Sequence, residues 1–179
     1  MLSFRYFTWE KNIKKIIENN NKYNFIKEIV NFCLDNKIET SFGDSVSEYF
    51  ATIMAYNYLT KNIDAHCKNF SLIYVLDLDW YKLQWASLYD LNSMYINIEP
   101  LMSMSYGDEL NYNKIRLDNF ELLAKDLNLQ SEIMYSILSS MTDEISDIAF
   151  DVSNNHKILY HDALCYDGLV KLIAQTEKN

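Results

Sequence analysis

The sequence contains only three glycines, one proline and three cysteines among 179 residues. Glycine and proline build most tight turns, and glycine-rich loops hold nucleotide phosphates, so the chain is poor in both kinds of loop.

The cysteines, Cys33, Cys67 and Cys165, form no CxxC pair, and their spacing predicts neither a disulfide framework nor a zinc knuckle. We expect buried thiols in a reducing compartment. A zinc site formed by His66, Cys67 and Cys165 is an alternative that the ligand spacing does not support.

Long hydrophobic runs and basic residues are also scarce. No run of about 18 uncharged apolar residues occurs, and the N-terminal segment MLSFRYFTWEKNIKK does not resemble a signal peptide. Sixteen Lys and Arg stand against 25 Asp and Glu, which gives a formal charge of −9. This balance argues against a surface that neutralises phosphates. We therefore expect a cytoplasmic protein with neither a membrane nor a nucleic acid as a direct partner, and a helical nucleic-acid-binding domain is the least favoured alternative.

Hydrophobic residues make up 49% of the chain and charged residues 23%, a composition typical of a folded domain with a sizeable core. At this length we expect a single domain over residues 1–179. Helical periodicity dominates, with apolar residues spaced three and four positions apart. The predicted helices span residues 8–19, 23–36, 45–60, 117–127, 129–150 and 158–175.

The segment 45–60 differs from the other predicted helices because it is apolar almost all round, which is typical of a helix in the middle of a domain. Asp44 or Ser45 could cap its start. Two short runs rich in β-forming residues follow at 70–76 and 81–85, and together they predict a hairpin. The chain is therefore predicted to be mainly helical, with one short β-hairpin directly after a buried helix.

The stretch around Pro100 and Gly107 is rich in Met, Ser and Tyr and is predicted to be irregular. Met94, Met102 and Met104 lie in or near it. Methionine adapts to irregular surroundings, so these side chains could line a substrate groove, but core filling is the favoured interpretation. The acidic residues of the C-terminal helices are predicted to form a solvated surface; they are Glu132, Asp143, Glu144 and Asp147.

A polar cluster, NIDAHCKN at residues 62–69, lies between the predicted buried helix and the hairpin. Polar groups between two apolar elements either satisfy backbone groups or act on a ligand. Downstream, Asp90 places a second carboxylate just after the return strand. An Asp, an Asn five residues later, a hairpin and another Asp is the order found in protein-kinase C-lobes. There the first carboxylate orients the accepting hydroxyl, while the Asn and the second Asp hold magnesium.

The longer string is far more specific than this spacing. Asn-x-Asp-Ala-His-x-Lys-Asn-Phe-Ser-Leu at 62–72 resembles the catalytic loop of the HipA family of serine/threonine protein kinases. The run Tyr89-Asp90-Leu91 resembles that family's Tyr-Asp-Leu, which takes the part of Asp-Phe-Gly in other kinases. The sequence departs from the family at Ser87, where a proline is common.

Three flanking segments extend the resemblance, which is strongest over residues 45–128. They are similar to the family's Asn-x-Leu on the preceding helix, to its Ala-Met-x-Ile-Gly stretch and to the helix that follows; here these are Asn57-Tyr58-Leu59, residues 102–107 and residues 115–128. The resemblance implies a protein-kinase-like C-lobe of the HipA C-terminal type, acting in a toxin–antitoxin module with Mg²⁺ and ATP as cofactors and a protein as substrate.

The resemblance also implies a role for each polar residue of the loop. Asp64 would be the catalytic base, and Asn69 and Asp90 would be the magnesium ligands. His66 and Lys68 would lie near the transferring phosphate or brace the loop. The competing interpretation is structural: Asp64 and Asn69 would satisfy loop amides, and His66 would be a buried, hydrogen-bonded residue.

A kinase of this family would carry a β-rich N-lobe with a phosphate-covering loop and a strand lysine. Only 63 residues precede Asp64 here, they have helical patterns, and their only glycine is Gly43. Their Lys14, Lys15 and Lys27 lie on predicted helical faces. We therefore expect a C-lobe without an N-lobe, with weak or partner-dependent ATP binding.

Two hypotheses follow, and we expect kinase activity in this chain alone to be very low. In the first, the chain is half of a split kinase and another chain supplies the N-lobe. In the second, it is an inactive pseudokinase remnant that acts as a protein-binding module. The expected partners are an N-lobe chain, an antitoxin protein or a second copy of this chain in a homo-oligomer. Asp64, Asn69 and Asp90 together favour the first hypothesis.

Overall fold

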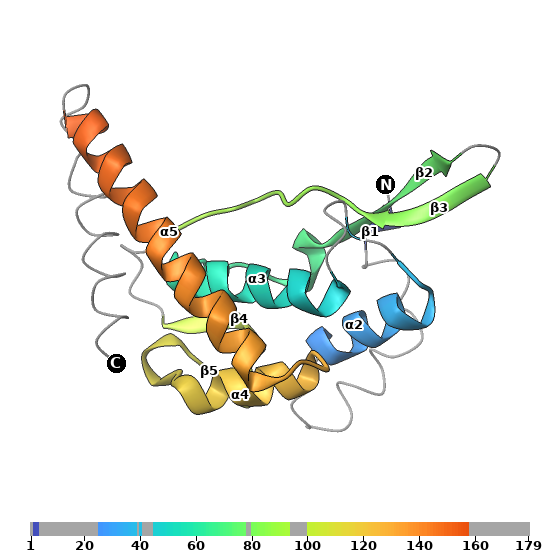
Figure 1. Ribbon diagram of the computed structural model, residues 1–179, viewed down its shortest axis with the longest axis horizontal. Coiled ribbons are helices and arrows are strands. Elements are labelled where there is room, and N and C mark those ends of the chain that lie inside the picture. Colours follow the sequence, from blue (N-terminus) through green and yellow to red (C-terminus); the bar gives the residue numbers. More distant parts are fainter. Residues whose placement is uncertain are drawn as a thin grey trace.

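The structure, a computed structural model, describes residues 2–3, 25–38, 40, 45–77, 80–93 and 100–157. Its helices are α2 (Phe25–Asp35), α3 (Val46–Leu59), α4 (Leu117–Asp126) and α5 (Ser131–Lys157). Its strands are β1 (Leu2–Ser3), β2 (Ser71–Asp77), β3 (Trp80–Trp85), β4 (Leu101–Tyr106) and β5 (Glu109–Asn111). In Figure 1, α3 lies at the centre, the long α5 crosses it, and the β2–β3 hairpin projects beyond the helices. No helix within these ranges is long and apolar enough to cross a membrane.

Helix α3 is the buried central helix that its apolar sequence predicts. Ser45 caps it, because its side chain accepts a hydrogen bond from the backbone N–H of Glu48 at 3.1 Å. Ten of its fourteen residues are buried, since neighbouring elements cover it on several sides. At its other end the N–H of Thr60 donates to the carbonyl of Tyr56 at 2.9 Å and closes the last turn.

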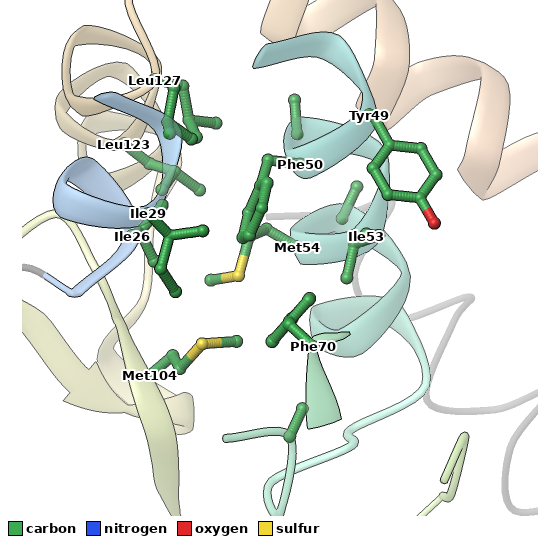
Figure 2. Close-up of a cluster of buried hydrophobic side chains, with 14 of the residues drawn as sticks. Ile26, Ile29, Tyr49, Phe50, Ile53, Met54, Phe70, Met104, Leu123 and Leu127 are labelled. Atoms are coloured by element: carbon green, nitrogen blue, oxygen red, sulfur yellow. The ribbon is translucent and has the colours of Figure 1, made fainter. Parts of the chain in front are cut away.

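The core forms where α3 meets the other helices and β4. Figure 2 shows side chains that converge on this point from the surrounding elements: Ile26 and Ile29 from α2, Phe50 and Met54 from α3, Met104 from β4, and Leu123 and Leu127 from the end of α4. Met102 and Met104 are both almost fully buried, so the core interpretation of these methionines is confirmed. Four acidic residues of α5 that were predicted to be solvated, Glu132, Asp143, Glu144 and Asp147, are exposed.

The predicted hairpin is present as β2 and β3, which pair antiparallel from Leu72 opposite Trp85 to Asp77 opposite Trp80. Trp85 is buried at the base of the hairpin, 5.2 Å from the Phe50 ring and 6.2 Å from the Phe70 ring. Strand β1 pairs with β2 and adds a third strand that the sequence did not predict. The aromatic contacts at its base fix the hairpin to α3.

One expectation about the fold was wrong. The stretch around Pro100 and Gly107 is not irregular but contains a second hairpin, β4–β5. Burial alternates along β4, with Met102, Met104 and Tyr106 inside, which is the period of a half-covered strand. The sequence itself alternates apolar Met and Tyr with polar Ser over residues 102–106, so this strand could have been predicted from its period. Gly107 takes a positive φ of 57° in the turn, where an added Cβ would lie 2.5 Å from the Cβ of Leu122.

The remaining helix predictions have mixed outcomes. The helices predicted at 23–36 and 117–127 are confirmed as α2 and α4. The helix predicted at 129–150 is confirmed but continues to Lys157 in α5. The helices predicted at 8–19 and 158–175, together with Met94, lie outside the described residues. The described part is therefore mainly helical, with two small antiparallel sheets.

The central tyrosines allow a matched test of this packing. Tyr106 is fully buried and its hydroxyl donates to the carbonyl of Met54 at 2.7 Å, whereas no described residue hydrogen-bonds to the hydroxyl of neighbouring Tyr58. We expect Tyr106→Phe to lower the free energy of unfolding by about 1 kcal/mol and Tyr58→Phe by less than about 0.5 kcal/mol. Urea unfolding of the two variants measures both values. Equal losses would contradict the assigned hydrogen bond.

Candidate active site

The loop after α3 is shaped by two buried asparagines. The backbone N–H of Asn62 donates to the carbonyl of Asn57 at 2.7 Å, and its side-chain amide donates to Asn57 Oδ1 at 3.0 Å. Between them Lys61 has a positive φ of 52°, which reverses the chain at the end of the helix. Both asparagines are 2% exposed, so this polar pair fixes the start of the loop from inside the domain.

Asp64 projects from the tip of the loop. The residues on either side of it, Ile63 and Ala65, are buried, and Asp64 itself is exposed. The carbonyl of Ile63 accepts a hydrogen bond from the backbone N–H of Ser103 in β4 at 2.9 Å. Strand β4, which was not predicted from the sequence, thus fixes the backbone of the loop next to Asp64. The carboxylate of Asp64 faces solvent.

His66 and Lys68 follow on the same loop. Lys68 is exposed and His66 is half-buried, and neither side chain makes a hydrogen bond or ion pair with the described part of the chain. The Nδ1 atom of His66 is buried without a partner, so the interpretation of His66 as a satisfied core histidine is not supported. The short turn Cys67–Asn69 then leads into β2.

The structure joins Asn69 to Asp90 across the hairpin. The side-chain amide of Asn69 donates to Asp90 Oδ2 at 2.7 Å, although 21 positions separate the two residues. Asn69 is 8% exposed, whereas Asp90 lies at the surface with a φ of 58°, a conformation that aspartate tolerates better than most residues. The two predicted metal ligands therefore lie together. Asp64 lies on the same loop as Asn69, and no hydrogen bond among the described residues joins it to Asn69 or Asp90.

Several residues that hold this arrangement were not predicted from the sequence. The hydroxyl of Tyr89 donates to the carbonyl of Lys68 at 2.6 Å and lies 2.8 Å from the hydroxyl of Ser71. The hydroxyl of Ser93 donates to the carbonyl of Thr60 at 2.8 Å. Figure 1 shows that the extended segment after β3 runs back over α3. Tyr89, Asp90 and Ser93 belong to this segment. The segment is thus fastened to the loop on both sides of Asp90.

Asn92 is a further unpredicted residue, and it contacts the carboxylate itself. Its side-chain amide donates to Asp90 Oδ1 at 2.9 Å, so both oxygens of Asp90 accept an amide hydrogen bond. The sequence signal was weak, because an asparagine two positions after an aspartate is common in turns. Asn69 and Asn92 together orient the carboxylate of Asp90.

The residues present fit a small, hard cation. A cavity of about 10 Å³, room for about one water molecule, is lined by Asn62, Asn69 and Asp90 among others. The oxygens Asn62 Oδ1 and Asn69 Oδ1 are both buried without a hydrogen-bond partner. Amide and carboxylate oxygens are the ligands that Mg²⁺ prefers, and a half-turn of the Asn69 amide would present its oxygen beside Asp90. Within the described ranges, no cluster of three His, Cys, Asp or Glu side chains offers a different metal site.

The cysteines in the described part have the chemistry of buried thiols. Burial raises the pKa of Cys33 to about 12 and raises that of Cys67 as well, an effect that neighbouring Lys68 partly offsets. Both remain protonated thiols at neutral pH, which disfavours metal binding by sulfur. Cys165, the third member of the zinc alternative, lies outside the described residues.

Comparisons with known proteins agree with this geometry. The profile of the family "HipA-like C-terminal domain" matches residues 13–149. A curated relative, "Putative kinase Y4mE" of Sinorhizobium fredii, is 27% identical over 110 residues, which cover 60% of this chain and 25% of the relative. The chain belongs to the HipA-like C-terminal domain family.

A solved structure shows the same fold. It contains HipA of Shewanella oneidensis in a complex with HipB and operator DNA, with a TM-score of 0.59 and 22% identity. The match covers 72% of this chain and 31% of that HipA chain. The C-lobe fold expected from the sequence is therefore confirmed. The neighbouring complex contains DNA, and the comparisons do not support the expectation that this chain has no nucleic acid partner.

The hydrogen bond between Asn69 and Asp90 can be measured with a double-mutant cycle. We expect Asn69→Ala and Asp90→Ala to be coupled by about 1.5 kcal/mol in the free energy of unfolding, because one partner is ionised and the other is buried. The backbone strain that alanine adds at position 90 cancels in the cycle. Asn92→Ala is the control, since its exposed contact with Asp90 should couple by less than about 0.5 kcal/mol. A coupling near zero for Asn69 would contradict the contact.

Proposed function

We propose that this domain is the C-lobe of a HipA-like serine/threonine protein kinase that transfers a phosphoryl group from Mg-ATP to a protein hydroxyl. The observation that carries this proposal is the Asn69–Asp90 pair, which joins two oxygen-bearing side chains across the hairpin. Asp64 stands on the same anchored loop as Asn69. Phosphoryl transfer requires this combination of a metal-binding pair and a nearby carboxylate.

Each residue of the loop would have one task. Asp64 is exposed and would accept the proton of the substrate hydroxyl, or orient that hydroxyl for attack. Asn69 and Asp90 would hold magnesium, which neutralises charge on the phosphates when bound. The positive charge of Lys68 and the half-buried ring of His66 would stabilise the transferring phosphoryl group. The hydrogen bonds of Tyr89 and Asn92 would keep Asp90 in place throughout.

In this proposal, the nucleotide-binding half of the kinase is supplied from outside these 179 residues. The chain spans about a quarter of the curated relative and 31% of the structural neighbour. Its three glycines, at positions 43, 107 and 168, do not form a glycine-rich phosphate loop. Positioning of the nucleotide supplies much of the rate in kinases, so the domain would need this second lobe for efficient turnover.

An antitoxin is the partner that fits this proposal. The neighbouring structure pairs HipA with HipB, and the shared fold supports a similar toxin–antitoxin role here.

A pseudokinase that binds proteins is the second candidate. It is favoured by the hydrogen bonds from Asn69 and Asn92, which engage both oxygens of Asp90. The two candidates differ in whether a cation can displace these amides. In the pseudokinase, phosphoryl transfer would be absent even when the second lobe is present.

The kinase proposal predicts weak nucleotide binding by the isolated chain. Without a phosphate loop or an adenine wall, we expect Mg-ATP to bind with a dissociation constant from the high micromolar to the millimolar range, or about −4 to −6 kcal/mol. Isothermal titration calorimetry with Mg-ATP measures this affinity. A low-micromolar constant would show that these residues contain a nucleotide wall of their own.

Activity is tested on the complex purified through a tag on this chain from its own cells, so that any second lobe stays bound. We expect phosphate from γ-labelled ATP on serine or threonine, and we expect Asp64→Ala and Asp90→Ala to reduce labelling at least 100-fold. Ser136→Ala, an exposed position on α5, serves as the control and should retain full activity. Labelling that survives both aspartate substitutions would overturn the proposal, and a complex with no labelling would favour the pseudokinase.

A further inference from the structure

A second cavity lies on a different part of the domain, between the last turn of α3, the start of α4 and the middle of α5. Its volume is about 410 Å³, within the range of small-molecule binding sites. Its walls are mostly apolar and include Leu59, Ile115, Phe120 and Leu138. None of the loop residues from Asp64 to Asn69 lines it. This cavity is called the α3–α5 pocket below.

Two polar residues that line the α3–α5 pocket, Tyr58 and Arg116, have hydrogen-bond donors without a partner among the described residues. The Tyr58 side chain is half-buried, and no described residue hydrogen-bonds to its hydroxyl. Arg116 donates through Nη1 to the carbonyls of Asn113 at 3.0 Å and Ile115 at 2.9 Å, but it makes no ion pair with any residue that the structure describes. Arg116 is exposed, and its other guanidinium N–H groups make no hydrogen bond with any residue that the structure describes.

These two groups lie close enough to influence each other. Burial raises the pKa of the Tyr58 phenol, and the charge of Arg116 acts in the opposite direction. A phenol O–H and a guanidinium together form a site for an anion, because both donate hydrogen bonds and the guanidinium can bind a carboxylate through two N–H groups. Tyr58 and Arg116 in the lining of the pocket are therefore complementary to a carboxylate.

The wall of the pocket formed by Tyr135 lies near negative charges. Its hydroxyl donates to Glu121 Oε1 at 2.5 Å, and this bond, together with the nearby charges of Asp118 and Glu132, raises the pKa of Tyr135 to about 12. Negative charge at this wall disfavours an anion there. A bound carboxylate would therefore be oriented with its head toward Arg116 and its apolar body along the walls.

We propose that the α3–α5 pocket binds a small amphipathic carboxylate, with the carboxylate on Arg116 and Tyr58 and an apolar body against Leu59, Phe120 and Leu138. At about 30 Å³ for each non-hydrogen atom, the volume accommodates roughly a dozen such atoms. The site is separate from the Asn69–Asp90 pair. It goes beyond the proposed phosphoryl transfer and does not depend on it.

Decanoate is a suitable probe, and 1-decanol is its neutral counterpart of the same chain length. Calorimetric titration of the full chain should show one saturable site for decanoate. Arg116→Gln should weaken decanoate at least tenfold and change decanol less than twofold, because the substitution removes the charge and leaves the apolar walls. Tyr58→Phe should weaken decanoate about threefold, since it removes one hydrogen bond.

A pair of substitutions on α5 tests the location of the site. Ser139 lines the pocket and Ser136 does not, and both are exposed serines on the same helix. Ser139→Phe should abolish binding of both probes by filling the pocket, whereas Ser136→Phe should leave binding unchanged. Circular dichroism of each variant confirms that the helices are retained.

Three results would overturn this proposal. The first is the absence of saturable decanoate binding by the folded chain. The second is an equal effect of Arg116→Gln on decanoate and decanol, which would show that the arginine does not recognise the carboxylate. The third is binding that survives Ser139→Phe, which would place the ligand elsewhere.

Discussion

The packing of Trp85 against Phe50 and Phe70 is the contact on which the candidate active site depends. Phe70 follows the loop that carries Asp64 and Asn69, Trp85 ends the return strand, and Phe50 belongs to the central helix, so one aromatic cluster fixes all three. The antiparallel pairing of β2 and β3 begins beside this cluster. Asn69 lies just before β2 and Asp90 lies shortly after β3, so both lie outside the paired residues at the same end of the hairpin. Hydrophobic burial determines the register of β2 against β3, and this register brings Asn69 and Asp90 together.

Much of this arrangement could be predicted from the sequence, for identifiable reasons. The all-round apolar pattern of α3 and the β-rich runs of the hairpin have strong local signals, and both are present. The proximity of Asn69 and Asp90 followed from the resemblance to kinase loops, and the structure gives it a physical basis. The prediction succeeded where periodicity or a long motif identified an element directly.

The remaining features depend on contacts between distant residues, which local patterns do not encode. Strand β4 has an alternating sequence, but the hydrogen bond by which its Ser103 holds the loop at Ile63 joins residues 40 positions apart and has no local signal. The roles of Tyr89 and Asn92 were missed because each is defined by a partner across a turn or a hairpin. The α3–α5 pocket has no sequence signal at all, since three separate helices form it. Its wall includes Leu59, one residue before the Thr60 carbonyl that accepts from Ser93, so the end of α3 borders both sites.

The central claim is that Asn69 and Asp90 can hold one divalent cation across the base of the hairpin. Paramagnetic broadening by Mn²⁺ in ¹H–¹⁵N spectra of the full chain tests it most directly. We expect the side-chain amides of Asn69 and Asn92 to broaden first, while the amide of Asn128 remains sharp. Asp90→Ala should remove this selective broadening. Uniform broadening, or selective broadening that persists in Asp90→Ala, would contradict the claim.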